Sequence, residues 1–133
     1  LHLRGYKAPA IENFGSTHDQ FDTVDLTDNE IRKLDGFPLL KRLKHIILTD
    51  NKIIRIAEDL TFQVPNLETL ILSGNNFAEL KDLDPLSLCK NLTFLTLAQC
   101  PVALKPNYRL YVVFRIPNVS LLMSVLVSYF FIK

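Results

Sequence analysis

Two carboxylates spaced two residues apart, Asp82 and Asp84, are the side chains of this sequence best suited to acid–base chemistry. Paired carboxylates act in this way when a further acid, a base or a metal ion accompanies them. No such group accompanies this pair. Asp84 followed by Pro85 is instead typical of a helix start, with the aspartate as N-cap and the proline in the first turn. We therefore expect a structural role here and a chain that is not an enzyme.

Other chemical signatures are equally sparse. The three histidines, His2, His18 and His45, lack the spacing of metal ligands, and the four glycines are too scattered to form a phosphate-binding loop. Cys89 and Cys100 form no CxxC motif and fall on different sides of one repeat, so neither a disulfide nor a metal site is expected. The sequence predicts no cofactor, no metal and no small-molecule substrate.

Length and composition indicate one small folded domain. The chain has 133 residues, of which 48% are hydrophobic and 22% are charged, with a formal net charge of +1. This hydrophobic content is too high for a disordered chain, and two cysteines are too few for a small disulfide scaffold. The chain opens on Leu1 without a signal-type segment, so we expect an intracellular unit that is a fragment or an interior segment.

The charges are unevenly distributed along the chain. Residues 1–84 contain 10 Lys and Arg against 14 Asp and Glu, a net charge of −4, whereas residues 85–133 contain 5 Lys and Arg and no acidic residue, a net charge of +5. This division permits a basic protein partner at the first part and a phosphate backbone at the second. An ordinary solvated surface explains the same division, and both explanations remain open.

An internal repeat dominates the sequence. The pattern Leu-xx-Leu-x-Leu-xx-Asn-x-Leu recurs with its asparagine position stepping by 22, 24 and 25 residues, which is the period of leucine-rich repeats. A half copy with Leu1, Leu3 and Tyr6 lies one period before the first full copy. The four full copies are Phe21, Val24, Leu26, Asn29, Ile31; Leu43, Ile46, Leu48, Asn51, Ile53; Leu67, Leu70, Leu72, Asn75, Phe77; and Leu92, Leu95, Leu97, Cys100, Val102.

Each position of the repeat has a physical role. The alternating apolar pair, such as Val24 and Leu26, has the period of a strand and points inward, so stacked copies form a parallel sheet. The residue at the asparagine position bonds backbone groups that would otherwise be buried without partners. This predicted ladder consists of Asn29, Asn51, Asn75 and Cys100.

The segments that return between strands form the convex side. Apolar residues recur there at three-residue steps, which predicts short helical or 3₁₀ turns. They are Ile31, Leu34, Phe37 and Leu40, and again Ile53 and Ile56. The predicted fold is thus an α/β solenoid, a leucine-rich repeat with a parallel concave sheet and short turns on its convex side.

The outward side chains of the predicted strands line the concave face, where solenoids commonly bind partners. The central column reads Asp25, Ile47, Ile71 and Thr96, which suits an amphipathic helix with some positive charge. The alternative is that both isoleucines are ordinary exposed strand residues. The predicted partner-binding residues are Thr23, Asp25, Thr27, His45, Ile47, Thr49, Thr69, Ile71, Ser73, Phe94 and Thr96, with Ala98 completing the face.

Segments between the repeats carry a more specific resemblance. Residues 29–38, 82–86 and 108–119, the last reading Tyr-Arg-Leu-Tyr-Val-Val-Phe-Arg-Ile-Pro-Asn-Val, resemble the U2 small nuclear ribonucleoprotein A-prime family, as do residues 3–7 and 11–13. The resemblance covers residues 1 to about 119. It implies a nuclear, non-enzymatic spliceosomal subunit whose concave sheet holds a helix of the RNA-recognition-motif domain of a B-double-prime partner. It further implies that the pair binds a stem-loop of U2 small nuclear RNA in pre-mRNA splicing, with the partner reading the loop bases.

The same resemblance suggests which residues contact RNA and argues against other classes of repeat protein. The basic residues available for RNA phosphates are Arg4, Lys7, Lys105, Arg109 and Arg115. A phosphatase-regulatory or dynein-associated repeat protein would share the repeat rhythm, but it would not explain residues 108–119.

Both ends of the chain differ from the family pattern. We expect a repeat domain over residues 1–119, with about four to five repeats and a capping helix at 107–116 that packs Tyr111 and Phe114 into the core. The family's N-terminal segment before the first repeat is absent. Residues 120–133 form an apolar, divergent tail, too short to span a bilayer. A final strand and a membrane-interface segment are possible, but an altered coding end giving an exposed, aggregation-prone tail is favoured, and no membrane partner is predicted.

Overall fold

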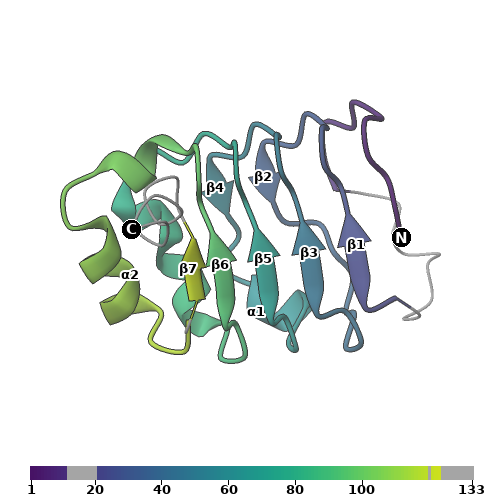
Figure 1. Cartoon of the computed structure of the whole chain (residues 1–133). Helices are drawn as coiled ribbons and strands as arrows, with labels where there is room; N and C mark the ends of the chain where they lie inside the picture. Colours follow the sequence, from purple (N-terminus) through teal and green to yellow (C-terminus); the bar gives the residue numbers. More distant parts are fainter. Residues whose placement is uncertain (12–20, 120, 124–133) are drawn as a thin grey trace.

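Parallel strands, one from each full repeat and one from the C-terminal segment, form the main sheet of the molecule. The computed structural model describes residues 1–11, 21–119 and 121–123. The five strands stack in the order β1 (Thr23–Asp25), β3 (His45–Ile47), β5 (Thr69–Ile71), β6 (Phe94–Thr96) and β7 (Leu121–Met123) (Figure 1). Corresponding repeat positions pair directly, as in Val24 with Ile46 and Leu70 with Leu95. The predicted leucine-rich repeat fold with a parallel sheet is therefore present.

The first residues of the chain extend this sheet beyond β1. The backbone N–H of Asp25 donates to the Leu1 carbonyl at 2.8 Å, and the N–H of Leu3 donates to the Asp25 carbonyl at 2.8 Å. Leu1 and Leu3 pack against the core, whereas Tyr6 is exposed. The half copy read from the sequence thus lies beside the first full repeat and covers part of its end.

The core fills the space between the sheet and the returning segments. Repeat leucines and isoleucines such as Ile46, Leu48, Leu70 and Leu72 are fully buried. Each side chain of this kind contributes about 1.5–3 kcal/mol when it is removed from water. Because every repeat contributes the same positions, one continuous apolar core runs along the stack.

In the first repeats, the convex side does not have the secondary structure that the sequence predicts. Two short strands, β2 (Lys33–Leu34) and β4 (Arg55–Ile56), pair in parallel where helical or 3₁₀ turns were expected. The expectation was wrong there because the returning segments bond to each other between repeats, as in Ile54 N–H to the Arg32 carbonyl at 3.1 Å. Among the described residues, helical turns follow in the later returning segments, in α1 (Leu60–Gln63), η1 (Leu80–Leu88) and η2 (Pro101–Leu104), of which the last two are 3₁₀ helices.

The predicted N-cap at Asp84 was also wrong. Helix η1 begins at Leu80 with Glu79 as its N-cap, and Pro85 lies inside it. The Asp82 carboxylate accepts the Glu79 backbone N–H at 3.1 Å, which completes a capping box. The capping carboxylates therefore precede Asp84, whose own side chain turns toward the C-terminal helix.

Helix α2 (Tyr108–Arg115) lies where the capping helix was expected, but its buried face is a different one. Tyr108 and Val112 are buried, whereas Phe114 is 88% exposed and Tyr111 is half-buried. The expectation that Tyr111 and Phe114 pack into the core was thus wrong, because residues four apart share a helix face and the chain sets the 108/112 face inward.

Asp84 fastens this helix to η1. The Tyr111 hydroxyl donates a hydrogen bond to the Asp84 carboxylate, and Arg115 Nε lies 3.2 Å from Asp84 Oδ1. The Arg115 guanidinium also lies 5.8 Å from the centroid of the Tyr111 ring, within cation–π range. The aspartate singled out as a possible catalytic group is therefore occupied in holding two elements together.

Part of the predicted tail is a strand. Residues 121–123 form β7, which pairs with β6, so one of the structures considered for this segment is present. Residue 120 and residues 124–133 lie outside the described part of the chain, as does the expectation of an exposed, aggregation-prone end. Within the described ranges, no helix is long and apolar enough to cross a membrane.

Gly74 has a left-handed backbone, as do Asp28, Asp50 and Gln99 at the same position of the other repeats. Its φ is +72°, and an added Cβ would collide with the Asp50 carboxylate of the preceding repeat. We expect Gly74→Ala to lower the free energy of unfolding by at least about 1 kcal/mol, because left-handed backbone and the collision both oppose it. Urea denaturation measures this change. Gly5→Ala, where φ is +71° but the added Cβ meets only ordinary contact, is the control and should cost less.

Candidate functional site

The face of the five-stranded sheet that points away from the core carries the predicted binding residues, and we call it the open sheet face. The register places Asp25 beside Ile47, Ile47 beside Ile71, and Ile71 beside Thr96. Neighbouring strands lie about 4.8 Å apart, so the two half-buried isoleucines form one continuous apolar strip. On its strand-start side the column His45, Thr69 and Phe94 is likewise half-buried and accessible.

On β1 and β6, this face is less open than the sequence suggested. Asp25, Thr27 and Thr96 are buried, with exposures of 7–9%, although they were expected to be available to a partner. The cause is local pairing: Thr27 Oγ1 donates to Asp25 Oδ1 at 2.6 Å, and Thr96 Oγ1 lies 3.1 Å from Ser73 Oγ. The centre of the open sheet face is therefore its accessible part.

Asp25 has charged neighbours from the first residues of the chain. Arg4 Nε lies 3.7 Å and His2 Nδ1 lies 3.8 Å from Asp25 Oδ2. Burial raises the pKa of Asp25, but hydrogen bonds from Thr27 and the positive charges of Arg4 and His2 outweigh it, so the pKa lies below its usual value. The carboxylate remains ionised, and Arg4 partly offsets its charge, which reduces its attraction for a basic partner.

The ladder residues bond neighbouring repeats together. Asn51 Nδ2 donates to the carbonyls of Leu26 at 2.9 Å and Leu48 at 3.1 Å, and Asn51 Oδ1 accepts the Ile31 N–H at 3.1 Å. Asn29 and Asn75 repeat this arrangement one repeat earlier and later. The ladder therefore fixes the spacing of the strands that display the open sheet face.

Cys100 takes the fourth ladder position with a reduced set of bonds. Its thiol donates to the Leu72 carbonyl at 3.1 Å. Both cysteines are free and buried. Burial raises the pKa of Cys100, and the backbone N–H groups of Asn75 and Gly74 partly oppose this rise. Burial also raises the pKa of Cys89 to about 11. Both thiols thus remain protonated at neutral pH, as a structural role requires.

This shift predicts a pH dependence of stability. The usual thiol pKa is 9.0, and the pKa of Cys89 in the folded chain is about 11. At a pH between these two values, the unfolded chain has lost the Cys89 proton while the folded chain keeps it. Stability must therefore fall as pH rises through this window, by about 2 kcal/mol between about pH 8 and pH 10.5. Urea denaturation of the wild type and of Cys89→Ala isolates the thiol, because only the wild type carries this contribution. Parallel pH profiles of the two proteins would contradict it.

The five basic residues proposed for RNA contact do not form one patch. Arg4 and Lys7 lie at the N-terminal end of the stack, whereas Lys105, Arg109 and Arg115 lie at its other end, around α2 (Figure 1). Lys105 Nζ lies 3.6 Å from Glu79 Oε1, and Arg115 is held by Asp84. In the described part of the chain, Lys7 and Arg109 have no such carboxylate partner.

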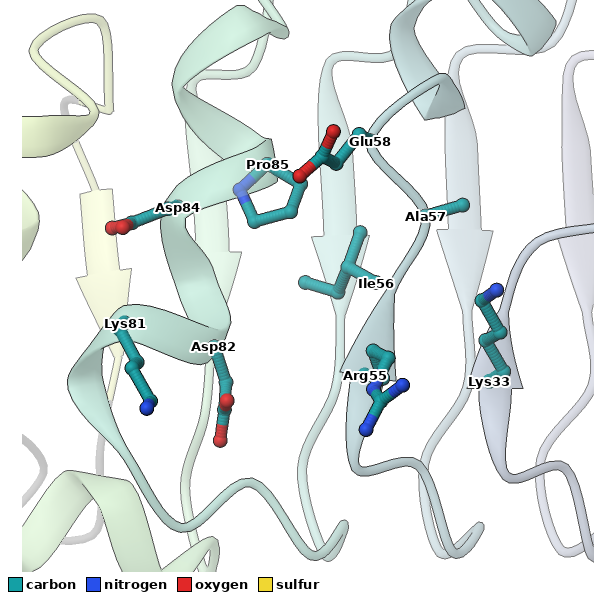
Figure 2. A pocket seen from close by; sticks show the side chains of 9 residues that line it. All are labelled: Lys33, Arg55, Ile56, Ala57, Glu58, Lys81, Asp82, Asp84 and Pro85. Carbon is teal, nitrogen blue, oxygen red and sulfur yellow. The ribbon is translucent and has the colours of Figure 1, made fainter.

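A convex groove was missed by the sequence reasoning. It lies between β4 and η1, has a volume of about 410 Å³, and contains Lys33, Arg55 and Lys81 together with Glu58 (Figure 2). One signal was available: Lys33 and Arg55 both stand four residues after a ladder asparagine, and β2–β4 pairing sets them side by side. Among the residues that the structure describes, no group of three or more His, Cys, Asp and Glu side chains could hold a metal ion.

Comparison with known proteins decides the family. A family model described as leucine-rich repeat matches residues 1–127. The chain belongs to the leucine-rich repeat family. Over 122 residues it is 55% identical to U2 small nuclear ribonucleoprotein A′ of Homo sapiens and 44% identical to that of Arabidopsis thaliana. Each match covers 92% of this chain, together with 48% of the human protein and 49% of the Arabidopsis protein. The chain therefore spans about half the length of the curated relatives it matches.

A solved structure agrees with this assignment. A chain of the crystal structure of the Drosophila melanogaster SNF/U2A′ complex matches with a TM-score of 0.90 and 53% identity, covering 92% of this chain and 70% of that one. The resemblance to the U2 small nuclear ribonucleoprotein A′ family, read from the segments between the repeats, is confirmed.

Proposed function

We propose that this chain is a non-enzymatic interaction subunit of the U2 small nuclear ribonucleoprotein, acting in the nucleus in pre-mRNA splicing. Its open sheet face, the concave face of a solenoid, holds a helix of the RNA-recognition-motif domain of a B-double-prime type partner. The observation that carries this proposal is the Ile47–Ile71 strip, which is accessible at the centre of the face and flanked by polar side chains. An apolar strip with polar borders suits one face of an amphipathic helix.

The comparisons support a protein partner. The matching Drosophila chain comes from a complex of U2A′ with SNF, and the relatives from human and Arabidopsis carry the ribonucleoprotein name. None of these names favours the phosphatase-regulatory or dynein-associated alternative. Since Arg4 already partly offsets the charge of the buried Asp25, apolar contact at the two isoleucines contributes more to affinity than charge attraction at the acidic end.

RNA binding belongs mainly to the partner in this proposal. The pair binds a stem-loop of U2 small nuclear RNA, and the partner reads the bases, because base readout requires unstacked bases and stacking surfaces. This chain contributes phosphate contacts through its basic residues. Lys7 and Arg109 are the better candidates, since Arg4, Lys105 and Arg115 each lie near a carboxylate. Phosphate contacts position RNA without reading its sequence.

A capture experiment tests the proposal. The chain is immobilised in nuclear extract, and bound protein and RNA are identified. We expect the B-double-prime protein together with U2 RNA, and we expect both to be lost with Ile47→Glu/Ile71→Glu. A bait shown by circular dichroism to be folded that recovers neither would contradict the function. Recovery of both that persists in the double variant would contradict the assignment to this face.

A further inference from the structure

The turn after each strand of the main sheet is bonded to the next repeat. One residue of this turn, just before the ladder position, has a positive φ in every full repeat. In the first three full repeats the N–H of this residue donates to a backbone carbonyl of the following repeat, each time at 2.9 Å. The bonds run from Asp28 to Thr49, from Asp50 to Ser73 and from Gly74 to Ala98. The same bond thus closes each junction between full repeats.

The turn after β6 has the same shape but lacks this bond. Gln99 occupies the equivalent position, with a φ of 62°. Among the described residues, none accepts a hydrogen bond from its N–H. β7 pairs with β6 with Met123 opposite Thr96, so the same register places Val125 opposite Ala98. The carbonyl that would complete the series is therefore that of Val125, two residues beyond the end of β7.

An apolar pocket lies at the same place. It has a volume of about 280 Å³ and is lined by Gln99, Cys100, Pro101, Ala103 and Leu104. Leu104 is 72% exposed. In the earlier repeats the following ladder residue bonds back across this surface, whereas β6 is followed by β7 and α2 without a further described ladder residue (Figure 1). The last full repeat therefore has an uncovered apolar surface where its predecessors are covered.

The sequence contains one more copy of the repeat spacing. Val119, Leu122, Ser124, Val127 and Tyr129 have the spacing of Leu92, Leu95, Leu97, Cys100 and Val102. Four of these five positions are apolar, and the leucine-rich repeat family model extends to residue 127. Because α2 already packs on η1 and η2, a further copy needs only its strand and its ladder position at this end.

We propose that residues 124–127 continue β7 along the turn of the last full repeat and cover this pocket. The Val125 carbonyl accepts the Gln99 N–H, and the Val127 side chain lies on Cys100 as the fifth member of the ladder column. Val127 has no amide to bond the backbone, but it buries apolar surface, which contributes about 1.5–3 kcal/mol for a side chain of this size.

The connection to β7 favours this segment over other occupants. Val127 is four residues from Met123, so the segment is held at a high effective concentration beside the pocket. A second copy or an outside protein would have to displace it. The open sheet face would also gain position 125 beside Ala98, so the surface presented to a partner would be longer than the described strands alone.

Amide hydrogen exchange, followed by NMR on the purified full chain, tests this proposal. We expect the Gln99 N–H to exchange at least about 100-fold more slowly than an unstructured amide, as the bonded Gly74 N–H does. Val127→Asp should remove the protection of Gln99 and leave that of Gly74, because a carboxylate is costly on an apolar surface. Val125→Asp is the control, since the same change at an outward position of the register should leave both amides protected.

Four outcomes would overturn the proposal. The first is unprotected Gln99 in a wild-type chain whose Gly74 is protected. The second is protection of Gln99 that survives Val127→Asp. The third is equal loss of protection at Gln99 in the two variants while Gly74 stays protected. The fourth is protection of Gln99 that rises with protein concentration, because a second copy of the chain would then cover the pocket.

Discussion

Replacing Ile47 and Ile71 together by glutamate is expected to weaken binding of the B-double-prime type partner by at least about 100-fold, which corresponds to about 2.7 kcal/mol. The two side chains are register partners on β3 and β5 and form the accessible apolar strip of the open sheet face. Carboxylates placed there would be buried without partners beneath a docked helix, which is costly. Isothermal titration calorimetry with the purified partner domain measures the change.

The control for this prediction changes two more exposed apolar residues on the other side of the molecule. Ile54 and Phe62 are 50% and 73% exposed, on the convex side near β4 and in α1. Ile54→Glu/Phe62→Glu should bind the partner as the wild type does. If both double variants lost affinity to the same extent while remaining folded, the open sheet face would not be the binding site.

Asp25→Lys, at the acidic end of the central column, is a less informative substitution. Asp25 is 7% exposed and accepts bonds from both the backbone and the hydroxyl of Thr27. A lysine there would break these bonds and meet Arg4 and His2. Loss of binding would then mix a local structural change with a lost contact, which Ile47→Glu/Ile71→Glu avoids.

The second large effect is expected at the ladder. Asn51→Ala removes hydrogen bonds to the Leu26 and Leu48 carbonyls and to the Ile31 N–H, and Asn51 is 5% exposed. Buried backbone groups left without partners cost about 1–3 kcal/mol each, partly offset where water or small shifts reach them. We expect a loss of about 3 kcal/mol in the free energy of unfolding, measured by urea denaturation.

The exposed Asn66 supplies the comparison for Asn51. Its Nδ2 donates to the Lys41 carbonyl at 2.7 Å, so it also links two repeats, but outside the core. Asn66→Ala should cost about 1 kcal/mol or less, since water replaces the lost bond. Equal losses at the two positions would mean that burial of the ladder is not the source of its contribution.

The repeat spacing predicted the main sheet well because it reflects a physical necessity. Pairs such as Ile46 and Leu48 must alternate to place apolar side chains on one face, and Asn51 must stand where backbone groups are buried. The same positions recur in each copy, so the pairing of residues between neighbouring strands could be predicted by aligning the copies. Tyr111 and Phe114 were placed wrongly because a helix of eight residues offers more than one apolar face, and only contact with η1 and η2 selects Tyr108 and Val112.

The candidate site was less predictable than the fold. The strand positions identified which side chains point outward, but exposure depends on neighbours that are distant in sequence, as Arg4 and Thr27 are arranged around Asp25. The convex groove could not be read at all, since its floor and its cations come from returning segments whose shape is set by pairing of β2 with β4 and by η1. Charge pairs such as Arg115 with Asp84 join residues 31 positions apart.

Site-specific photocrosslinking tests most directly whether the open sheet face holds the partner. A photoreactive phenylalanine analogue is placed at position 71, on β5, and in a separate protein at position 62, on the convex side. The purified RNA-recognition-motif domain of the B-double-prime protein is then added and the complex is irradiated. We predict a crosslink from position 71 and none from position 62. A crosslink from position 62 alone, in a complex of unchanged affinity, would contradict the account.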